Sequence, residues 1–289
     1  MISETVRNTL LQFQKNEITE YYIYKKLAAS IKDENNRRIL GKIADDEKRH
    51  YETWKTYTGA DLKPSRWKVW KYYLIARALG ITFGIKLMEK GEGTAQINYH
   101  ELGDSLNDAK LIAQEELAHE EALIAMIDEE RLKYVGSVVL GLNDALVELT
   151  GALAGFTLAL QNGPLIALTG SITGIAAALS MAASEYLSTK AEKTDKHPVK
   201  ASIYTGIAYI CTVILLILPY LFLNNIYLSL GISLTAAIVV IAVFNYYISV
   251  AKDEPFANRF WEMTILSLSV ALFSFFIAFL LRQFLGIEI

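Results

Sequence analysis

The stretch ADDEKRHYE, residues 44–52, places a glutamate three positions before a histidine, and AQEELAHEE, residues 113–121, repeats this arrangement. The two copies match at the alanine, the glutamate, the histidine and the final glutamate. One Glu-x-x-His pattern is weak evidence for a site, because charged solvent-facing helices often contain it by chance. Its recurrence in the same chain indicates an internal duplication.

The segment before each copy is repeated as well. KNEITEYYIY contains Glu17 and Tyr24, and KGEGTAQINY contains Glu92 and Tyr99, with the same spacing in both. The sequence therefore predicts two helix hairpins, each with a glutamate on its first helix and Glu-x-x-His on its second. We expect helices at about 3–30, 34–57, 66–102 and 107–134, joined into a ferritin-like four-helix bundle within an all-α protein.

The predicted bundle gathers six potential metal ligands. Residues i and i+3 share one face of a helix. The glutamates of each hairpin lie at similar distances from its turn, so all six side chains are expected to meet at one level. They are Glu17, Glu47, His50, Glu92, Glu116 and His119. Four carboxylates and two imidazoles are the ligand set of a di-iron or di-manganese site. The alternative is duplicated charge that faces solvent and binds no metal.

Charge divides the chain into two predicted domains. Residues 1–134 contain 21 of the 28 Lys and Arg residues and 22 of the 31 Asp and Glu residues, whereas residues 135–289 contain 7 and 9. This pattern predicts a mixed-charge domain over 1–134 and a membrane domain over 135–289. No basic patch indicates nucleic-acid binding. The single cysteine, Cys211, excludes an intrachain disulfide.

The second domain contains five apolar runs, each long enough to span a bilayer. They lie at about 135–160, 164–189, 200–223, 226–250 and 261–285. Basic residues concentrate before the first run and in the second and fourth breaks, so the positive-inside rule predicts a cytoplasmic N-terminal domain and an external C-terminus in the cell membrane. The N-terminus lacks a signal-peptide core, which agrees with this orientation.

The segment 67–87 is apolar and aromatic, but it also contains basic residues, so we do not expect it to span the membrane. We expect a core helix that touches the membrane surface or a partner subunit.

Three acidic residues lie inside the first two predicted spans. Asp144 and Glu148 are four apart in the first span, and Glu185 follows Met181 by four in the second. Ionisable residues in spans are costly and usually mark ion or proton paths. The alternatives are acids that reach water at the cytoplasmic ends of their helices and a methionine that only packs.

Residues 3–134 resemble rubrerythrin and its ferritin-like relatives in the segments KNE…Y, DDEKRH, KGE…Y and EELAH. The resemblance implies a di-iron centre built from the six ligands above. Rubrerythrins carry a further carboxylate where this chain has Ala95, and Glu20 or Glu89 is a candidate for that additional ligand. The chain has no Cys-x-x-Cys pair for a rubredoxin iron centre, which weighs against rubrerythrin peroxidase activity.

The segments GLNDALVELTGALAG and ALSMAASEYLS resemble the vacuolar iron transporter family. This resemblance covers residues 135–289 and implies a five-span homodimer that moves Fe²⁺, and often Mn²⁺, out of the cytoplasm in exchange for protons. It assigns metal contacts to Asp144, Glu148, Met181 and Glu185. The fusion of both parts resembles the membrane-bound ferritins of prokaryotes.

Three functions follow from these patterns. The first is a metal exporter whose cytoplasmic bundle captures, senses or oxidises iron. The second is a membrane-anchored ferroxidase or peroxide-scavenging enzyme without transport, although an anchor needs no acidic residues in its spans. The third is a passive metal buffer. The membrane carboxylates favour the exporter.

Overall fold

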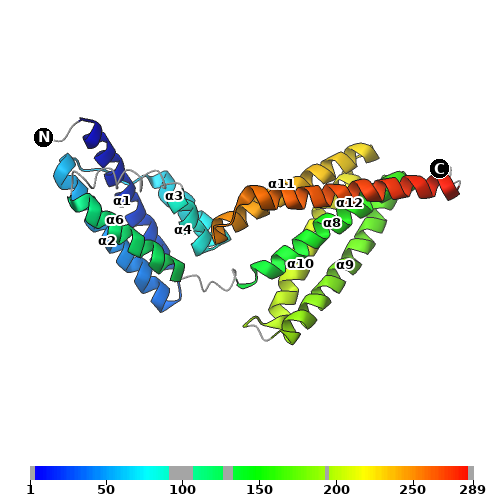
Figure 1. Ribbon diagram of the computed structural model, residues 1–289, viewed down its shortest axis with the longest axis horizontal. Coiled ribbons are helices and arrows are strands. Elements are labelled where there is room, and N and C mark those ends of the chain that lie inside the picture. Colours follow the sequence, from blue (N-terminus) through cyan, green and yellow to red (C-terminus); the bar gives the residue numbers. More distant parts are fainter. Residues whose placement is uncertain (1–3, 91–106, 126–132, 193–194, 286–289) are drawn as a thin grey trace. The chain divides into compact units, whose positions relative to one another are not determined.

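The computed structural model describes residues 4–90, 107–125, 133–192 and 195–285, and every regular element in these ranges is a helix. The chain forms two compact units, Met1–Glu129 and Glu130–Ile289. N-terminal helices are followed by five long apolar helices, which confirms the predicted all-α class (Figure 1).

The first unit begins with a helix hairpin. Helices α1 (Glu4–Ser30) and α2 (Glu34–Thr58) pack side by side, and α6 (Asn107–Ala125) packs against α2. The Asp33 side chain caps α2 by accepting a hydrogen bond from the backbone of Asn36. Helices α1 and α6 therefore lie within the ranges predicted from the duplication, and α2 ends one residue beyond its range. Residues 126–134 of the fourth predicted helix extend beyond the described part of α6.

The third predicted helix, 66–102, is wrong as a single continuous element. It is interrupted at Gly80, which separates α3 (Arg66–Leu79) from α4 (Ile81–Lys90). Gly80 has φ 110° and ψ 148°, a conformation that side chains with a Cβ rarely adopt. The apolar pattern continues through this glycine, so it did not reveal the break. Residues 91–102 of the predicted helix lie outside the described ranges.

The second unit contains α8 (Val135–Leu160), α9 (Gly163–Ala191), α10 (Pro198–Phe222), α11 (Ile226–Lys252) and α12 (Phe256–Leu285). All five are long and apolar enough to cross a membrane, so the structure contains the five candidate spans that the sequence predicts. The short break between the third and fourth runs is a true turn, because Asn225 caps α11 by accepting from two backbone N–H groups.

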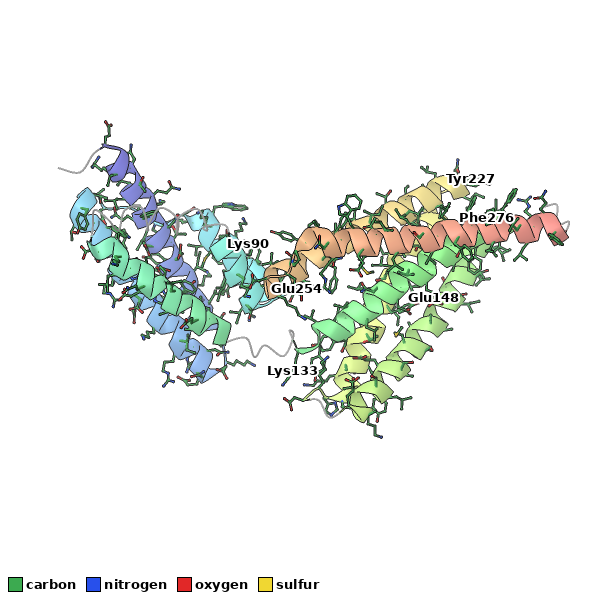
Figure 2. The ribbon with its side chains drawn as sticks, in the orientation of Figure 1. Lys90, Lys133, Glu148, Tyr227, Glu254 and Phe276 are labelled. Carbon is green, nitrogen blue, oxygen red and sulfur yellow. The ribbon has the colours of Figure 1, made fainter. Side chains whose placement is uncertain are left out.

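Helix α8 is the centre of the second unit and packs against the other four helices. Lys133, before α8, and Glu254, between α11 and α12, lie at one end of this unit, and Tyr227 lies at the other (Figure 2). Helices α9 and α10 approach closely at Gly174, where a Cβ would lie 2.7 Å from a Val213 methyl group. Helix α8, which carries Asp144 and Glu148, therefore lies in the middle of a packed helical frame.

Candidate metal centre

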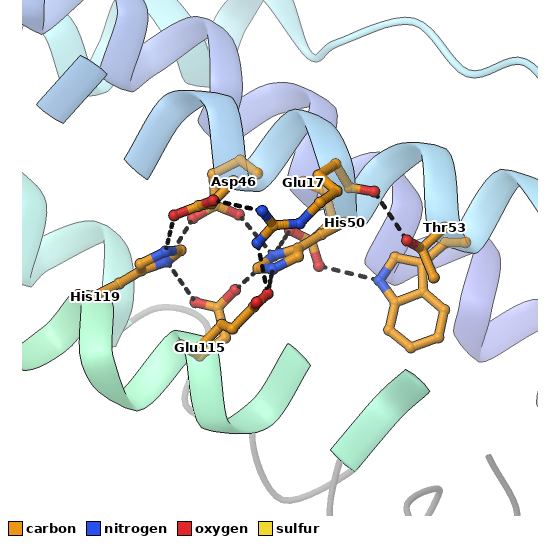
Figure 3. Close-up of polar contacts among 10 residues, drawn as sticks. Glu17, Asp46, His50, Thr53, Glu115 and His119 are labelled. Carbon is orange, nitrogen blue, oxygen red and sulfur yellow. Dashed lines mark hydrogen bonds and ion pairs between the residues drawn. The ribbon is translucent and has the colours of Figure 1, made fainter. Parts of the chain in front are cut away.

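Three helices of the first unit bring five of the predicted ligands together (Figure 3). Glu17 comes from α1, Glu47 and His50 come from α2, and Glu116 and His119 come from α6. One ligand atom from each of four residues lies within 4.8 Å of the others, and these residues are Glu17, Glu47, His50 and Glu116. Glu17, Glu47 and His50 are at most 3% exposed, and such burial of carboxylates is costly unless cations or hydrogen bonds compensate it.

Both imidazoles direct Nδ1 at carboxylates from more than one helix. His50 Nδ1 lies 3.1 Å from Glu116 Oε1, 3.5 Å from Glu17 Oε2 and 3.6 Å from Glu47 Oε2. His119 Nδ1 lies 3.3 Å from Glu47 Oε1 and 3.8 Å from Glu116 Oε2. The two rings are stacked with centroids 5.8 Å apart. The duplicated motifs thus converge on one shared set of oxygen atoms.

Three buried ligand atoms of this cluster have no hydrogen-bond partner: Glu47 Oε2, His50 Nδ1 and His119 Nδ1. Unsatisfied buried polar atoms are rare in folded proteins and cost free energy. Carboxylate oxygen and imidazole nitrogen are the donors that iron, manganese and zinc accept. The donor set and its orphaned atoms therefore fit a divalent transition-metal centre.

Each histidine is oriented by an acidic residue of the other repeat. His50 Nε2 lies 2.7 Å from Glu115 Oε2, and His119 Nε2 lies 3.1 Å from Asp46 Oδ2. In the neutral imidazole that binds metal, a proton on Nε2 would be donated to these carboxylates, which leaves the Nδ1 lone pair to bind a cation. The guanidinium of Arg49 joins the two acids, at 2.9 Å from Asp46 and 2.8 Å from Glu115. The sequence analysis missed Asp46 and Glu115, although an acid precedes the glutamate in both repeats.

Glu17 has a further partner that the sequence analysis also missed. The indole Nε1 of Trp54 donates a buried hydrogen bond of 3.1 Å to Glu17 Oε1. Trp54 lies one helical turn after His50, so this spacing was a signal that it shares the face of α2 that meets α1. The bond fixes one Glu17 oxygen, while the other lies near His50.

The neighbouring carboxylates stabilise the protonated form of both histidines. Burial alone lowers the pKa of His119, but contacts with Glu116 and Glu47 outweigh burial and raise it to about 10. His50 behaves in the same way: burial lowers its pKa, and its contacts with Glu116, Glu17 and Glu47 raise it well above the usual value. Burial, together with the charge of Glu116, raises the pKa of Glu47. Metal ligation requires neutral imidazole, so a bound cation must displace these protons.

The remaining predicted bundle ligands are not in this group. Glu92 lies outside the described residues. Glu89 belongs to α4, and its side chain is not described. Glu20 is half-buried on α1 and is not one of the residues whose ligand atoms converge.

A pocket of about 540 Å³ between α2 and α6 reaches the outer side of the cluster. Its lining includes His119, Asp46 and Glu115 together with the cations Arg38, Lys42 and Arg49. The pocket lets water and small solutes approach the second nitrogen of His119. The cluster is therefore buried among helices yet accessible from one side.

The membrane carboxylates have a different arrangement. In the described ranges, Asp144, Glu148 and Glu185 do not converge into a group of three ligand residues. Instead the Tyr209 hydroxyl of α10 donates to Glu148 at 2.9 Å, and the Ser137 hydroxyl of α8 donates to Glu185 of α9 at 2.5 Å. These hydrogen bonds link α8 to α9 and α10.

Asp144 and Met181 lie near the same core. Asp144 is half-buried one turn before Glu148, which is exposed and lies on α8 (Figure 2). Met181 is half-buried and packs against the apolar cluster that includes Leu146 and Leu149 of α8. The predicted path residues therefore occupy two adjacent helices, but the structure pairs each acid with its own hydroxyl neighbour or leaves it near the helix surface.

Comparison with known families gives a match within the second unit. Residues 135–197, which contain α8 and α9, match the VIT family. Comparisons with curated proteins and with solved structures gave no match. The matched part carries Asp144, Glu148, Met181 and Glu185, and a VIT family membrane domain implies iron or manganese transport.

Proposed function

We propose that this protein exports Fe²⁺, and also Mn²⁺, from the cytoplasm by proton antiport, and that its N-terminal unit captures or senses the metal. The observation that carries the proposal is the occurrence of the orphaned Glu/His cluster in the same chain as the VIT family match. Both features concern transition-metal ions, and neither an anchor nor a simple buffer needs both.

In the N-terminal unit, residues 1–134, the resident metals would be held by Glu17, Glu47, His50, Glu116 and His119, with Glu92 as the sixth ligand. Such a metal pair, when bound, supplies redox chemistry with O₂ or peroxide. The residues of the chain position the ligands: Asp46 and Glu115 orient the imidazoles, and Trp54 holds Glu17. Proton displacement from the histidines couples binding to cytoplasmic pH.

In the membrane unit, residues 135–289, carboxylates alternate between cargo and proton. Asp144 and Glu148 present oxygen ligands one turn apart on α8, and Met181 and Glu185 do the same on α9 with one sulfur and one oxygen. The hydroxyl groups of Tyr209 and Ser137 stabilise the acids between transport events by donating hydrogen bonds. An acid that releases metal accepts a proton, which accounts for exchange.

The orientation and assembly belong to the same proposal. Lysines and arginines gather before the first span and in the second and fourth breaks between spans, so this side, which includes Lys133, faces the cytoplasm and the C-terminus lies outside. The protein acts as a homodimer, as the VIT resemblance implies, within the lipid of the cell membrane. The Glu/His cluster then meets metal before it leaves the cell.

A second function is favoured by one observation. The Glu/His cluster could hold a metal ion without any residue of the membrane spans, so the second candidate is a membrane-anchored di-iron enzyme without transport. In that case the acids of α8 and α9 would not affect activity. This difference separates the two functions.

The test is metal flux into liposomes that contain the full-length protein, with a pH gradient imposed and Fe²⁺ or Mn²⁺ as cargo. The wild type is compared with Asp144→Ala, Glu47→Ala and a control, Glu262→Gln, which alters an exposed acid of α12. We expect Asp144→Ala to reduce flux at least about tenfold, since a lost ionic contact costs about 1.5–3 kcal/mol. Glu47→Ala should change how the flux depends on metal concentration, and the flux of the control should not differ from that of the wild type.

Absence of flux in the wild type would reject export. Consumption of O₂ or peroxide under those conditions, unchanged by Asp144→Ala, would establish the anchored enzyme instead. Equal flux in wild type and Asp144→Ala would show that the Asp144 carboxylate is not part of the transport path.

A further inference from the structure

Helix α3 has two apolar faces, and only one of them is used by the fold. Val69, Tyr72, Tyr73 and Ala76 pack into the core of the first unit. On the opposite side Trp67 is 76% exposed, Trp70 is 52% exposed and Leu74 is 57% exposed. These three residues lie at positions i, i+3 and i+7, which forms one stripe along the helix.

Within α3, the exposed stripe is flanked only by positive charge. Arg66, Lys71 and Arg77 are exposed beside it, and α3 contains Lys68 but no acidic residue. From α1, Lys26 places Nζ 3.3 Å from the centre of the Trp70 ring. Together the residues Arg66, Trp67, Trp70, Lys71, Leu74 and Arg77 form what we call the α3 face.

We propose that the α3 face binds the surface of an anionic lipid bilayer. Helices that lie in a membrane interface combine Trp and Leu on one side with Lys and Arg around it, because the rings enter the headgroup region while the cations meet lipid phosphates. The charge of the α3 face complements the negative cytoplasmic leaflet. A core helix does not require a second exposed apolar stripe.

The chain itself brings this surface within reach of a bilayer. Its second unit contains five candidate spans, so α3 is tethered to the membrane into which they insert. Tethering converts docking into an intramolecular step, for which even weak attraction is sufficient. A second copy of the same face is a poorer occupant, because its cations would oppose those of the first.

Docking of α3 gives the N-terminal unit a defined surface against the lipid. Helix α3 packs on α1, which carries Glu17 of the metal cluster. The inference is independent of transport, since an anchored enzyme could dock in the same way. It concerns only the surface that the exposed tryptophans and cations of α3 contact.

The experiment uses the full-length protein in lipid nanodiscs, with Cys211→Ser as background so that one introduced cysteine carries a nitroxide label. Labels are placed by Trp67→Cys or Leu74→Cys on the α3 face. The matched control is Leu111→Cys, since Leu111 is 56% exposed on α6 of the same unit. Collision with oxygen reports lipid contact, and collision with a water-soluble nickel chelate reports water. Circular dichroism confirms that each variant keeps its helix content.

We expect both α3 labels to favour oxygen in nanodiscs that contain phosphatidylglycerol, whereas the label at 111 favours the nickel chelate. Phosphatidylcholine alone, or high salt, should shift the α3 labels towards water. Lys71→Gln and Arg77→Gln should each lower the docked-to-undocked ratio about fivefold. Water-like α3 labels in anionic nanodiscs would overturn the proposal, and so would labels shielded from both reagents with dipolar coupling to each other, which would assign the face to a second copy.

Discussion

Asp46 on α2 lies 3.1 Å from the Nε2 atom of His119 on α6, and this contact crosses from one repeat of the chain to the other. Glu115 makes the reciprocal contact to His50 at 2.7 Å. Each repeat thus supplies candidate metal ligands of its own and the acid that contacts the histidine of its twin. This exchange ties the two halves of the duplication into one centre.

The first prediction concerns this orienting pair. Asp46→Asn should weaken Fe²⁺ or Co²⁺ binding by the full-length protein about 10–100-fold, because an outer carboxylate sets the tautomer and basicity of a ligating imidazole. Asp45→Asn is the matched control, since Asp45 is the exposed neighbour on the same helix. Anaerobic calorimetry measures both. Equal affinity in the two variants would show that Asp46 does not act through His119.

The second prediction concerns pH. Contacts with Glu116 and Glu47 outweigh burial and raise the pKa of His119 to about 10, so the metal-free centre holds that proton at neutral pH. Metal binding must release it, and apparent affinity should therefore rise with pH between about 6 and 9, by about tenfold per unit for each proton displaced.

Calorimetry in buffers of different ionisation enthalpy counts the protons released. His119→Gln removes the titrating group and should reduce both the count and the pH slope. Binding that releases no proton in the wild type would contradict a protonated His119.

The third prediction concerns the membrane unit. The Tyr209 hydroxyl donates to Glu148 at 2.9 Å, so Tyr209→Phe leaves that carboxylate without this donor. We expect metal flux in liposomes to fall about tenfold, since loss of a hydrogen bond to a charged group costs about 1.5–3 kcal/mol. Tyr227→Phe is the control, because Tyr227 is an exposed tyrosine at the start of α11. Unchanged flux in Tyr209→Phe would exclude a role for the pair.

The fourth prediction concerns the break between α3 and α4. Gly80→Ala should destabilise the protein by about 1–3 kcal/mol, because an alanine at φ 110° is strained. Gly41→Ala should instead stabilise by about 0.5–1 kcal/mol, because Gly41 lies inside α2 with open space where a Cβ would stand. Thermal unfolding of both variants in the same detergent gives the comparison. A melting temperature for Gly80→Ala at or above the wild-type value would mean that the break is not required.

The helical organisation was largely predictable. Apolar runs of sufficient length predict spans without any knowledge of packing, and the structure contains five such helices. The exception is Gly80, because hydrophobic periodicity records which residues face the core and not which backbone angles the chain adopts. Assignment of Glu92, Glu20 and Glu89 as bundle ligands stays a prediction, as does the role of Asp144, Glu148, Met181 and Glu185 in transport.

The sequence by itself determined the ligand types of the candidate centre. The duplicated Glu-x-x-His and the glutamate on the preceding helix are local patterns, which can be recognised from residue spacing along the chain alone. Only the tertiary structure decided which groups meet across helices: Asp46 with His119, Glu115 with His50, and Trp54 with Glu17. Those contacts depend on the relative rotation and offset of α1, α2 and α6. Such rotation arises from packing of whole helix faces, and no spacing within one helix specifies it.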